Sequence, residues 1–328
     1  MTIPVHVDQA RTCSMQTFKE EISVRGKPVL VDAVKVDGHV LILDGAVIKT
    51  ARLRDEWYED IEDPERILSA LRASNLGVDL FTMMQRLPDT SPRFGYYREL
   101  DSIAAVPIST YEHWFKKQID TNARRAIRNA EKKGVVVRST QYDDDFVKGM
   151  TDIYNEAPVR QGKRFWHYGK DVETVRKQFS KYLFREEMIG AYYQDELVGL
   201  IMLCHAGNYA ELGQIISKIA HRDKGVNNAL IAKAIEICGQ KKVPFLTYGY
   251  WKSGGAGDFQ RRNGFQKYDV PRYYIPLSLK GKQAIRWNLH RGLVATLPPG
   301  IKSRLVDLRT RWYSRKQAGA AKGGGKPA

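Results

Sequence analysis

The chain has 328 residues, of which 43% are hydrophobic and 10% aromatic, and its formal net charge at pH 7 is +16. This length allows one large domain or two medium ones, and the composition is that of a globular protein. No run approaches the roughly 20 apolar residues that span a bilayer, and the first residues lack the pattern of a secretory signal. The sequence therefore argues against membrane-spanning and disordered classes, and we expect a cytoplasmic protein.

The positive charge is unevenly distributed. The segment from Ser278 to Ala328 contains many Lys and Arg residues and a single acid, Asp307, and a second basic cluster lies within residues 124–133. Such segments attract phosphate-bearing partners, here tRNA or an anionic membrane surface. A solvated charged face explains either segment equally well, so both interpretations stay open.

Three cysteines, Cys13, Cys204 and Cys238, lie far apart in the sequence. They form no CxxC or zinc-ligand spacing, so we expect no metal site. Cys204 and Cys238 fall within apolar strand and helix patterns, which favours core packing over chemistry.

The N-terminal region, residues 1–108, contains a predicted β meander over residues 28–53. Asp-Gly turns at 37–38 and 44–45 separate its apolar runs, which is a typical hairpin pattern. Pro64 opens a predicted helix, because proline is favoured in the first turn. A strand is expected at 78–84, and the segment from Leu87 to Arg98 is expected to be a loop.

Residues 110–133 predict one long basic helix, because apolar positions recur every three or four residues. Gly134 ends it and a new strand begins, and we place the boundary of a second domain, residues 109–279, at this helix. Within that domain we expect two helices, over about 143–157 and 171–186, and then three short strands joined by tight turns. A loop, a helix from Val226, a strand, a short helix and two closing strands follow.

The loop before the Val226 helix carries the clearest motif. A helix N-terminus offers unpaired N–H groups and partial positive charge, and Gly225 lets the backbone approach a ligand closely. The loop therefore predicts a pyrophosphate site, with an ordinary strand-to-helix turn as the alternative. Its candidate cofactor-binding residues are Arg222, Lys224, Gly225, Val226 and Asn227.

This element order and loop resemble the GNAT superfamily, whose hallmark is Arg/Gln-x-x-Gly-x-Gly/Ala at this position. The resemblance implies a mixed α+β fold with a central, mostly antiparallel sheet flanked by helices. It also implies an N-acyltransferase that moves an acyl group from acyl-CoA, acetyl-CoA first, to an amine acceptor. Asn227 stands where the family has Gly or Ala, and Gln260 stands where it often has a tyrosine acid.

Acyl transfer to an amine requires a base, and Glu211 on the strand before the loop is the first candidate. A carboxylate among apolar strand residues has a raised pKa, although a strand glutamate that faces water is an equal alternative. His205 and His221 are substitutes for the base. Tyr248 and Tyr250 are candidates for the general acid, because Gln260 cannot donate a proton at useful pH.

A polar loop between the two early helices is expected to line the acceptor site, as the corresponding region does in GNAT proteins. Its basic residues are suited to select a phosphate or carboxylate on the acceptor, and a solvated basic loop is equally compatible. The candidate substrate-binding residues are Arg160, Lys163, Arg164 and Trp166.

A narrower resemblance is to the Fem-type branch of the superfamily, which uses aminoacyl-tRNA. It rests on the basic helix at 123–135, on the strand at 246–250, and on the Gly-Phe pair at 264–265. It implies that residues 1–108 form a partial GNAT-like domain. Two alternatives to acyl-CoA chemistry follow: a Fem-type aminoacyltransferase, or a catalytically silent module that binds RNA or an anionic membrane surface.

After residue 279 the pattern changes to two basic amphipathic helices over 280–316, separated by Pro298-Pro299-Gly300. They suit a membrane surface, a nucleic-acid backbone or packing on the domain. If they bind lipid, the protein is peripheral to the inner membrane surface. Residues 317–328 are of low complexity and are expected to be disordered.

Overall fold

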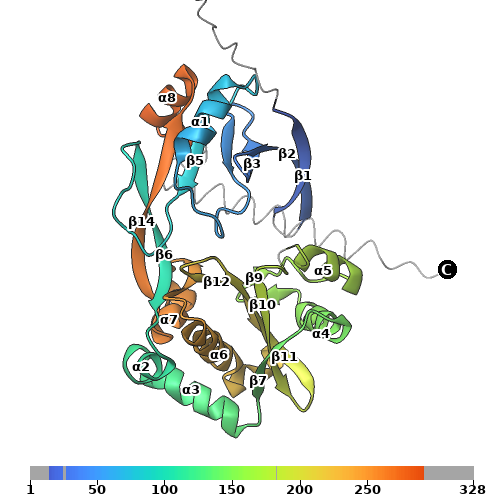
Figure 1. Cartoon of the computed structure of the whole chain (residues 1–328). Coiled ribbons are helices and arrows are strands. Elements are labelled where there is room, and N and C mark those ends of the chain that lie inside the picture. Colours follow the sequence, from blue (N-terminus) through green and yellow to red (C-terminus); the bar gives the residue numbers. More distant parts are fainter. Residues whose placement is uncertain (1–14, 25–26, 182, 292–328) are drawn as a thin grey trace, which may run out of the picture.

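The computed structural model describes residues 15–24, 27–181 and 183–291. Within these residues, twelve strands form one mixed sheet in the order β1-β2-β3-β4-β5-β14-β6-β13-β12-β11-β10-β7, and β8 and β9 form a separate hairpin. Helices cover the sheet, which gives the predicted mixed α+β architecture (Figure 1).

The N-terminal half builds one side of the sheet. Strands β1 to β4 pair antiparallel, and α1 then leads to β5, which pairs parallel to β4. Pro64 lies at the start of α1, and Asp37 and Gly38 form the β2–β3 turn with positive φ, both as the sequence predicts. The elements are β1 (Thr17–Val24), β2 (Lys27–Val36), β3 (His39–Asp44), β4 (Thr50–Leu53), α1 (Pro64–Ala73), β5 (Leu80–Met84) and β6 (Arg98–Pro107).

The C-terminal half repeats this order with more helices. Strands β10, β11 and β12 pair antiparallel, and α6 then leads to β13, which pairs parallel to β12. The elements are α2 (Tyr111–His113), η1 (Trp114–Gln118), α3 (Thr121–Lys132), β7 (Val136–Thr140), α4 (Asp144–Asn155), β8 (Val159–Arg160), β9 (Lys163–Arg164), α5 (Val172–Phe179), β10 (Glu186–Tyr193), β11 (Glu196–His205), β12 (Ala210–Ser217), η2 (Ile219–Lys224), α6 (Val226–Gln240), β13 (Phe245–Tyr250), α7 (Gly254–Arg262) and β14 (Gln266–Pro276).

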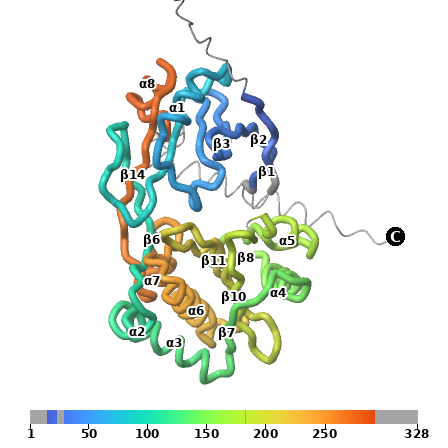
Figure 2. Tube along the Cα trace, viewed as in Figure 1, coloured from blue at the N-terminus to red at the C-terminus, as the bar shows by residue number. Residues whose placement is uncertain are grey.

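The two halves exchange their last strands. β6, from the N-terminal half, pairs with β13, and β14, from the C-terminal half, pairs with β5. β6 and β14 also pair with each other along Gln266–Tyr273, so they join the two halves along one side of the molecule (Figures 1 and 2). Each half therefore completes its sheet with a strand from the other.

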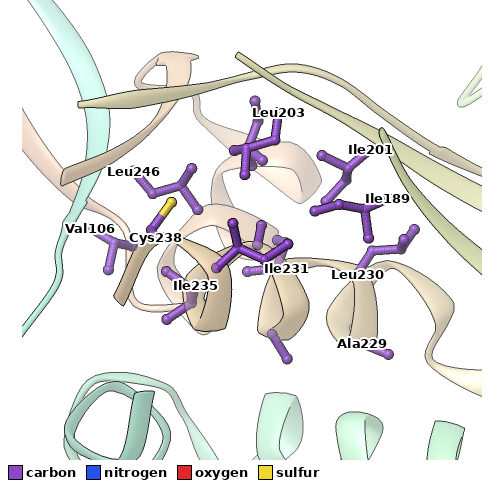
Figure 3. Packing of buried hydrophobic residues seen from close by; sticks show 14 of the residues in the cluster. Val106, Ile189, Ile201, Leu203, Ala229, Leu230, Ile231, Ile235, Cys238 and Leu246 are labelled. Atoms are coloured by element: carbon purple, nitrogen blue, oxygen red, sulfur yellow. The ribbon is translucent and has the colours of Figure 1, made fainter. Parts of the chain in front are cut away.

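Helix α6 lies at the centre of the largest hydrophobic core. Leu230, Ile231 and Ile235 pack against sheet residues such as Ile189, Ile201 and Leu203 (Figure 3). The outer side of α6 is covered by α3, so α6 is apolar on more than one face. Cys204 and Cys238 are both fully buried, which confirms the prediction that they pack in the core.

The long helix predicted over residues 110–133 is wrong in one respect, because it is broken at Ile119. Ile119 adopts an extended conformation, and the Asp120 carboxylate then caps α3 by accepting from the Ala123 N–H at 2.7 Å. The break turns the chain so that Ile119 is buried and α3 lies across α6.

Only part of the predicted C-terminal region lies within the described residues. α8 (Leu279–Arg286) and η3 (Leu289–Arg291) occupy the start of the first predicted amphipathic helix. Residues 292–328 lie outside the described residues, and they include the second predicted helix and the low-complexity tail. Among the described helices, none is both long and apolar enough to cross a membrane.

The strand exchange predicts that neither half folds alone. We expect a 1–108 fragment and a 109–328 fragment each to lack a cooperative thermal transition, because β5 loses β14 and β13 loses β6. Mixing the two fragments is expected to restore the transition, as measured by circular dichroism and by co-elution in gel filtration. A sharp transition of the 1–108 fragment on its own would contradict the prediction.

Candidate active site

The carboxylate of Glu211 lies where β12 and β13 part. The two strands pair at only two positions, Ala210 with Leu246 and Glu211 with Thr247. Beyond them, the N–H of Gly249 donates to Glu211 Oε1 at 2.9 Å, and the hydroxyl of Thr247 donates to Oε2. The side chain therefore continues a hydrogen-bond ladder that the backbone of β12 no longer makes.

Burial raises the pKa of Glu211 to about 7, against the opposing effects of the two hydrogen bonds and of the charges on Arg86 and Lys252. The residue is 5% exposed, so the water-facing alternative does not hold. A carboxyl group with a pKa near neutrality accepts and returns protons efficiently at physiological pH.

Glu211 is the end of a row of titratable side chains across three strands. Glu186, Cys204 and Glu211 are direct neighbours in register, so their side chains share one face of the sheet. Burial raises the pKa of Glu186 to about 7 and that of Cys204 to about 12, so the thiol stays protonated. Sequence reasoning missed Glu186, because it was assigned to the end of a helix predicted over 171–186.

A loop from the N-terminal half covers this row. The hydroxyl of Tyr209 donates to the carbonyl of Trp57 at 3.0 Å, and Arg185 donates to the carbonyl of Tyr58, also at 3.0 Å. Tyr209 precedes β12 and Arg185 precedes β10, so residues 57–58 reach both ends of the row. The candidate site is thus built from both halves, which the sequence did not indicate.

The two candidate tyrosines lie in different surroundings. Tyr248 packs against Phe259 and Phe265 in the α6 core, whereas Tyr250 meets the ring of Trp57 edge-on at 5.0 Å between centroids. Burial raises the pKa of both phenols. Tyr250 is the one on the side of the covering loop.

Gln260 has a structural role that explains why it is not a tyrosine. Its amide donates to the carbonyls of Tyr248 at 3.1 Å and Tyr250 at 3.0 Å, and it accepts from the N–H of Lys252 at 3.0 Å. This fully buried side chain fastens α7 to the end of β13.

The structure gives Gly225 a packing role. Its φ is +73°, and a Cβ added there would lie 2.4 Å from the carbonyl oxygen of Ala126 on α3. Val226 is buried in the core, Arg222 is exposed, and Lys224 lies over the Tyr193 ring at 4.8 Å. The backbone of α3, rather than open space, therefore faces this glycine.

A cavity of about 330 Å³ lies beside this turn. It is bounded by the starts of α3 and α6 and by α7, and its lining residues are Asn122, Ala123, Ala126, Asn228, Gly255, Asp258, Phe259 and Arg262. Asn227 lies on the same first turn of α6, and its side-chain oxygen is buried without a hydrogen-bond partner among the described residues.

The predicted acceptor loop lies at the far end of β12. Arg160 donates to the carbonyls of Ser217 at 2.8 Å and Ile153 at 2.5 Å and to Glu156 at 3.0 Å, so its guanidinium fastens the loop to the strand. Ser217 lies six positions after Glu211 on β12, about 20 Å along a strand. Lys163, Arg164 and Trp166 are exposed. The structure does not bring these four residues to Glu211.

No group of three or more His, Cys, Asp or Glu side chains in the described part of the chain is arranged to hold a metal ion.

No family model matches the chain, and no curated protein matches it by sequence. Solved structures do share its fold. One described as FemX has a TM-score of 0.50 at 9% identity and covers 83% of this chain and 90% of its own. The C-terminal domain of a putative lysylphosphatidylglycerol synthetase from Agrobacterium fabrum has a TM-score of 0.51 at 11% identity, covering 79% and 88%.

A tandem GNAT protein from the clavulanic acid biosynthesis pathway is similar at 14% identity over 76% of this chain and 83% of its own, with a TM-score of 0.43. The chain has the GNAT-superfamily fold in its Fem-like form, as the sequence predicts.

The contact with α3 makes Gly225 a stability determinant. We expect Gly225→Ala to lower the melting temperature by more than Gly207→Ala does, as measured by differential scanning calorimetry. Both glycines have similar positive φ, +73° and +71°, but nothing lies within 4 Å of a Cβ at Gly207. Gly207→Ala therefore shows only the backbone cost, about 1 kcal/mol, and equal effects of the two substitutions would contradict the packing role.

Proposed function

We propose that the protein is an acyltransferase that transfers an acyl group to an amine, with Glu211 as the general base. The observation that carries this proposal is the buried Glu211 carboxyl group at the parting of β12 and β13, whose pKa is raised to about 7. The fold is the supporting context, since it is that of acyl- and aminoacyl-transferases.

The reaction begins with a protonated amine, which has to lose a proton before it attacks. Glu211 takes this proton, and the amine nitrogen then bonds to the acyl carbonyl carbon, giving a tetrahedral intermediate with a negative oxygen. Collapse of the intermediate breaks the bond to the leaving group, which requires a proton. The protonated Glu211 or the hydroxyl of Tyr250 supplies it. The nitrogen, which became positively charged when it attacked, gives up its second proton to the regenerated Glu211 carboxylate or to the Tyr250 phenolate, so that the neutral amide is the product and one proton passes to water in the overall reaction.

Aminoacyl-tRNA is the donor that we favour. The outer face of α3 presents Arg125, Arg128 and Lys132 to solvent, and the start of the same helix lines the cavity, which suits a nucleic-acid backbone. The contact of α3 with Gly225 also restricts the turn on which a coenzyme A pyrophosphate would rest. The names of two structures that share this fold, FemX and a putative lysylphosphatidylglycerol synthetase, agree with aminoacyl transfer.

Acyl-CoA is the second candidate donor, and the cavity favours it. The space between α6 and α7 adjoins the free N–H groups of the first turn of α6, and Arg262 adds positive charge there. A phosphate-bearing arm of moderate length fits a cavity of about 330 Å³.

Glu211→Gln is expected to lower kcat/KM by about 10²–10⁴-fold, the range for loss of a general base. In the wild-type protein, kcat/KM is expected to rise with pH and to level off above about 7, because Glu211 acts only when deprotonated. Initial rates with amine acceptors across pH 5 to 9 measure both effects. Glu187→Gln is the control, because Glu187 lies on the same sheet but is paired with Lys241. A flat pH profile with an active Glu211→Gln variant would remove Glu211 from this role.

The donor is identified by two binding measurements. If tRNA is the carrier, we expect the protein to retain tRNA in a salt-sensitive way, and we expect retention to weaken in the Arg125→Ala/Arg128→Ala variant. We also expect a labelled amino acid carried by the tRNA to appear in an amide product. If acyl-CoA is the carrier, acetyl-CoA binds in calorimetry and Arg262→Ala weakens it. Absence of both kinds of binding, with no transfer, would leave a catalytically silent module.

A further inference from the structure

Arg86 is a buried cation between the two halves. It follows β5 by two residues, is 3% exposed, and places its guanidinium 4.9 Å from the ring centroid of Trp57 and 5.9 Å from that of Tyr209. Trp57 belongs to the covering loop, and Tyr209 adjoins Glu211. Arg86 is therefore part of the same junction as the proposed base.

One edge of this guanidinium has no hydrogen-bond partner among the described residues. The Nε and Nη2 atoms are buried and have no hydrogen-bond partner in the described part of the chain. Their N–H bonds point the same way, which matches the two oxygens of a carboxylate. Arg291 and Arg54 use the same edge on a carboxylate, each with both nitrogens on one oxygen: Arg291 donates to Glu99 Oε1 at 2.9 and 2.7 Å, and Arg54 donates to Asp55 Oδ2 at 3.0 and 2.8 Å.

The acidic side chains around the junction already have other partners. Both oxygens of Glu211 accept from Thr247 and Gly249, Glu56 is bonded to Arg272, and Asp60 is bonded to Arg93. The charge of Arg86 is in contact with the Trp57 and Tyr209 rings, but its two buried donors stay unmet, which is costly, so their presence indicates a hydrogen-bond partner that arrives from outside the protein.

We propose that Arg86 binds a carboxylate on the amine acceptor, so that the acceptor is an amino acid or a peptide carrying both groups. This inference rests on the proposed function, because it places the acceptor's amine near Glu211. A single free guanidinium edge matches a single negative charge with two oxygens, which favours a carboxylate over a phosphate monoester. The edge is covered in this structure, so the acceptor reaches it when the side chains between the halves move apart.

The first test is binding without turnover. Glycine and triglycine are compared with glycinamide and triglycinamide, which keep the amine but lack the carboxylate, at constant ionic strength. We expect the two acids to raise the melting temperature of the full chain and the two amides to leave it unchanged. Arg86→Met is expected to abolish the shift, and Arg86→Lys to weaken it, because lysine cannot present two parallel N–H groups.

The second test separates a ligand-binding arginine from a structural one. Arg86→Met removes an unpaired charge, so we expect its melting temperature without ligand to equal or exceed that of the wild type. Arg272→Met is the matched control, because Arg272 is largely shielded from solvent, with 11% of its side chain exposed, and is bonded to Glu56 and Asp101. Its loss leaves the two half-buried carboxylates of Glu56 and Asp101 without this partner, and we expect a lower melting temperature.

Three outcomes would overturn the inference. Equal shifts with acids and amides would show that the carboxylate is not recognised. A shift with glycerophosphoethanolamine but not with glycine would assign the edge to a phosphodiester. An Arg86→Met variant as destabilised as Arg272→Met, with unchanged ligand shifts, would make Arg86 structural.

Glycine binding and acyl transfer, measured on the wild type and on Glu211→Gln, distinguish this inference from the proposed function. If that variant and the wild type both bind glycine but the wild type transfers no acyl group, the proposed function fails and the carboxylate site stands. If the wild type transfers acyl groups equally well to glycine and glycinamide, the carboxylate site fails and the function stands.

Discussion

The hydrogen bond from the Gly249 N–H to Glu211 is the interaction on which the candidate site depends. Where β12 and β13 part, this N–H would otherwise lose its partner, and an unpaired buried donor is costly. The carboxylate fills the gap and is held inside the sheet by doing so. Burial there raises the pKa of Glu211 to about 7. The hydrogen bond that holds this carboxylate inside the sheet therefore also keeps it in the surroundings that bring its pKa near neutrality.

Local features of the fold could be predicted from the sequence, and long-range features could not. The Asp37-Gly38 turn and the start of α1 at Pro64 depend on neighbouring residues alone, and the structure has both. The exchange of β6 and β14 depends on pairing between residues more than 150 positions apart, such as Asp101 with Val270. The single helix expected over 110–133 was wrong because periodicity does not reveal that Asp120 serves as a cap within it.

The candidate site shows the same division. Glu211 could be found because a carboxylate among apolar strand residues is unusual, but its neighbours in register could not, since register is a property of the sheet. Gly225 is the opposite case. A glycine before a helix is required equally by a bound phosphate or by a crossing backbone, and only the position of Ala126 on α3 reveals the second reason.

The contribution of both halves follows from the strand exchange. β6 and β14 fix the halves along one side of the sheet, and this places the loop at Trp57 and the cation at Arg86 opposite the row that ends at Glu211. A base from one half and a cation from the other can hold the two ends of one small molecule. If the acceptor carries a carboxylate that binds Arg86, the N-terminal half contributes to specificity through the buried, unbonded Nε and Nη2 atoms of this side chain more than through its sheet.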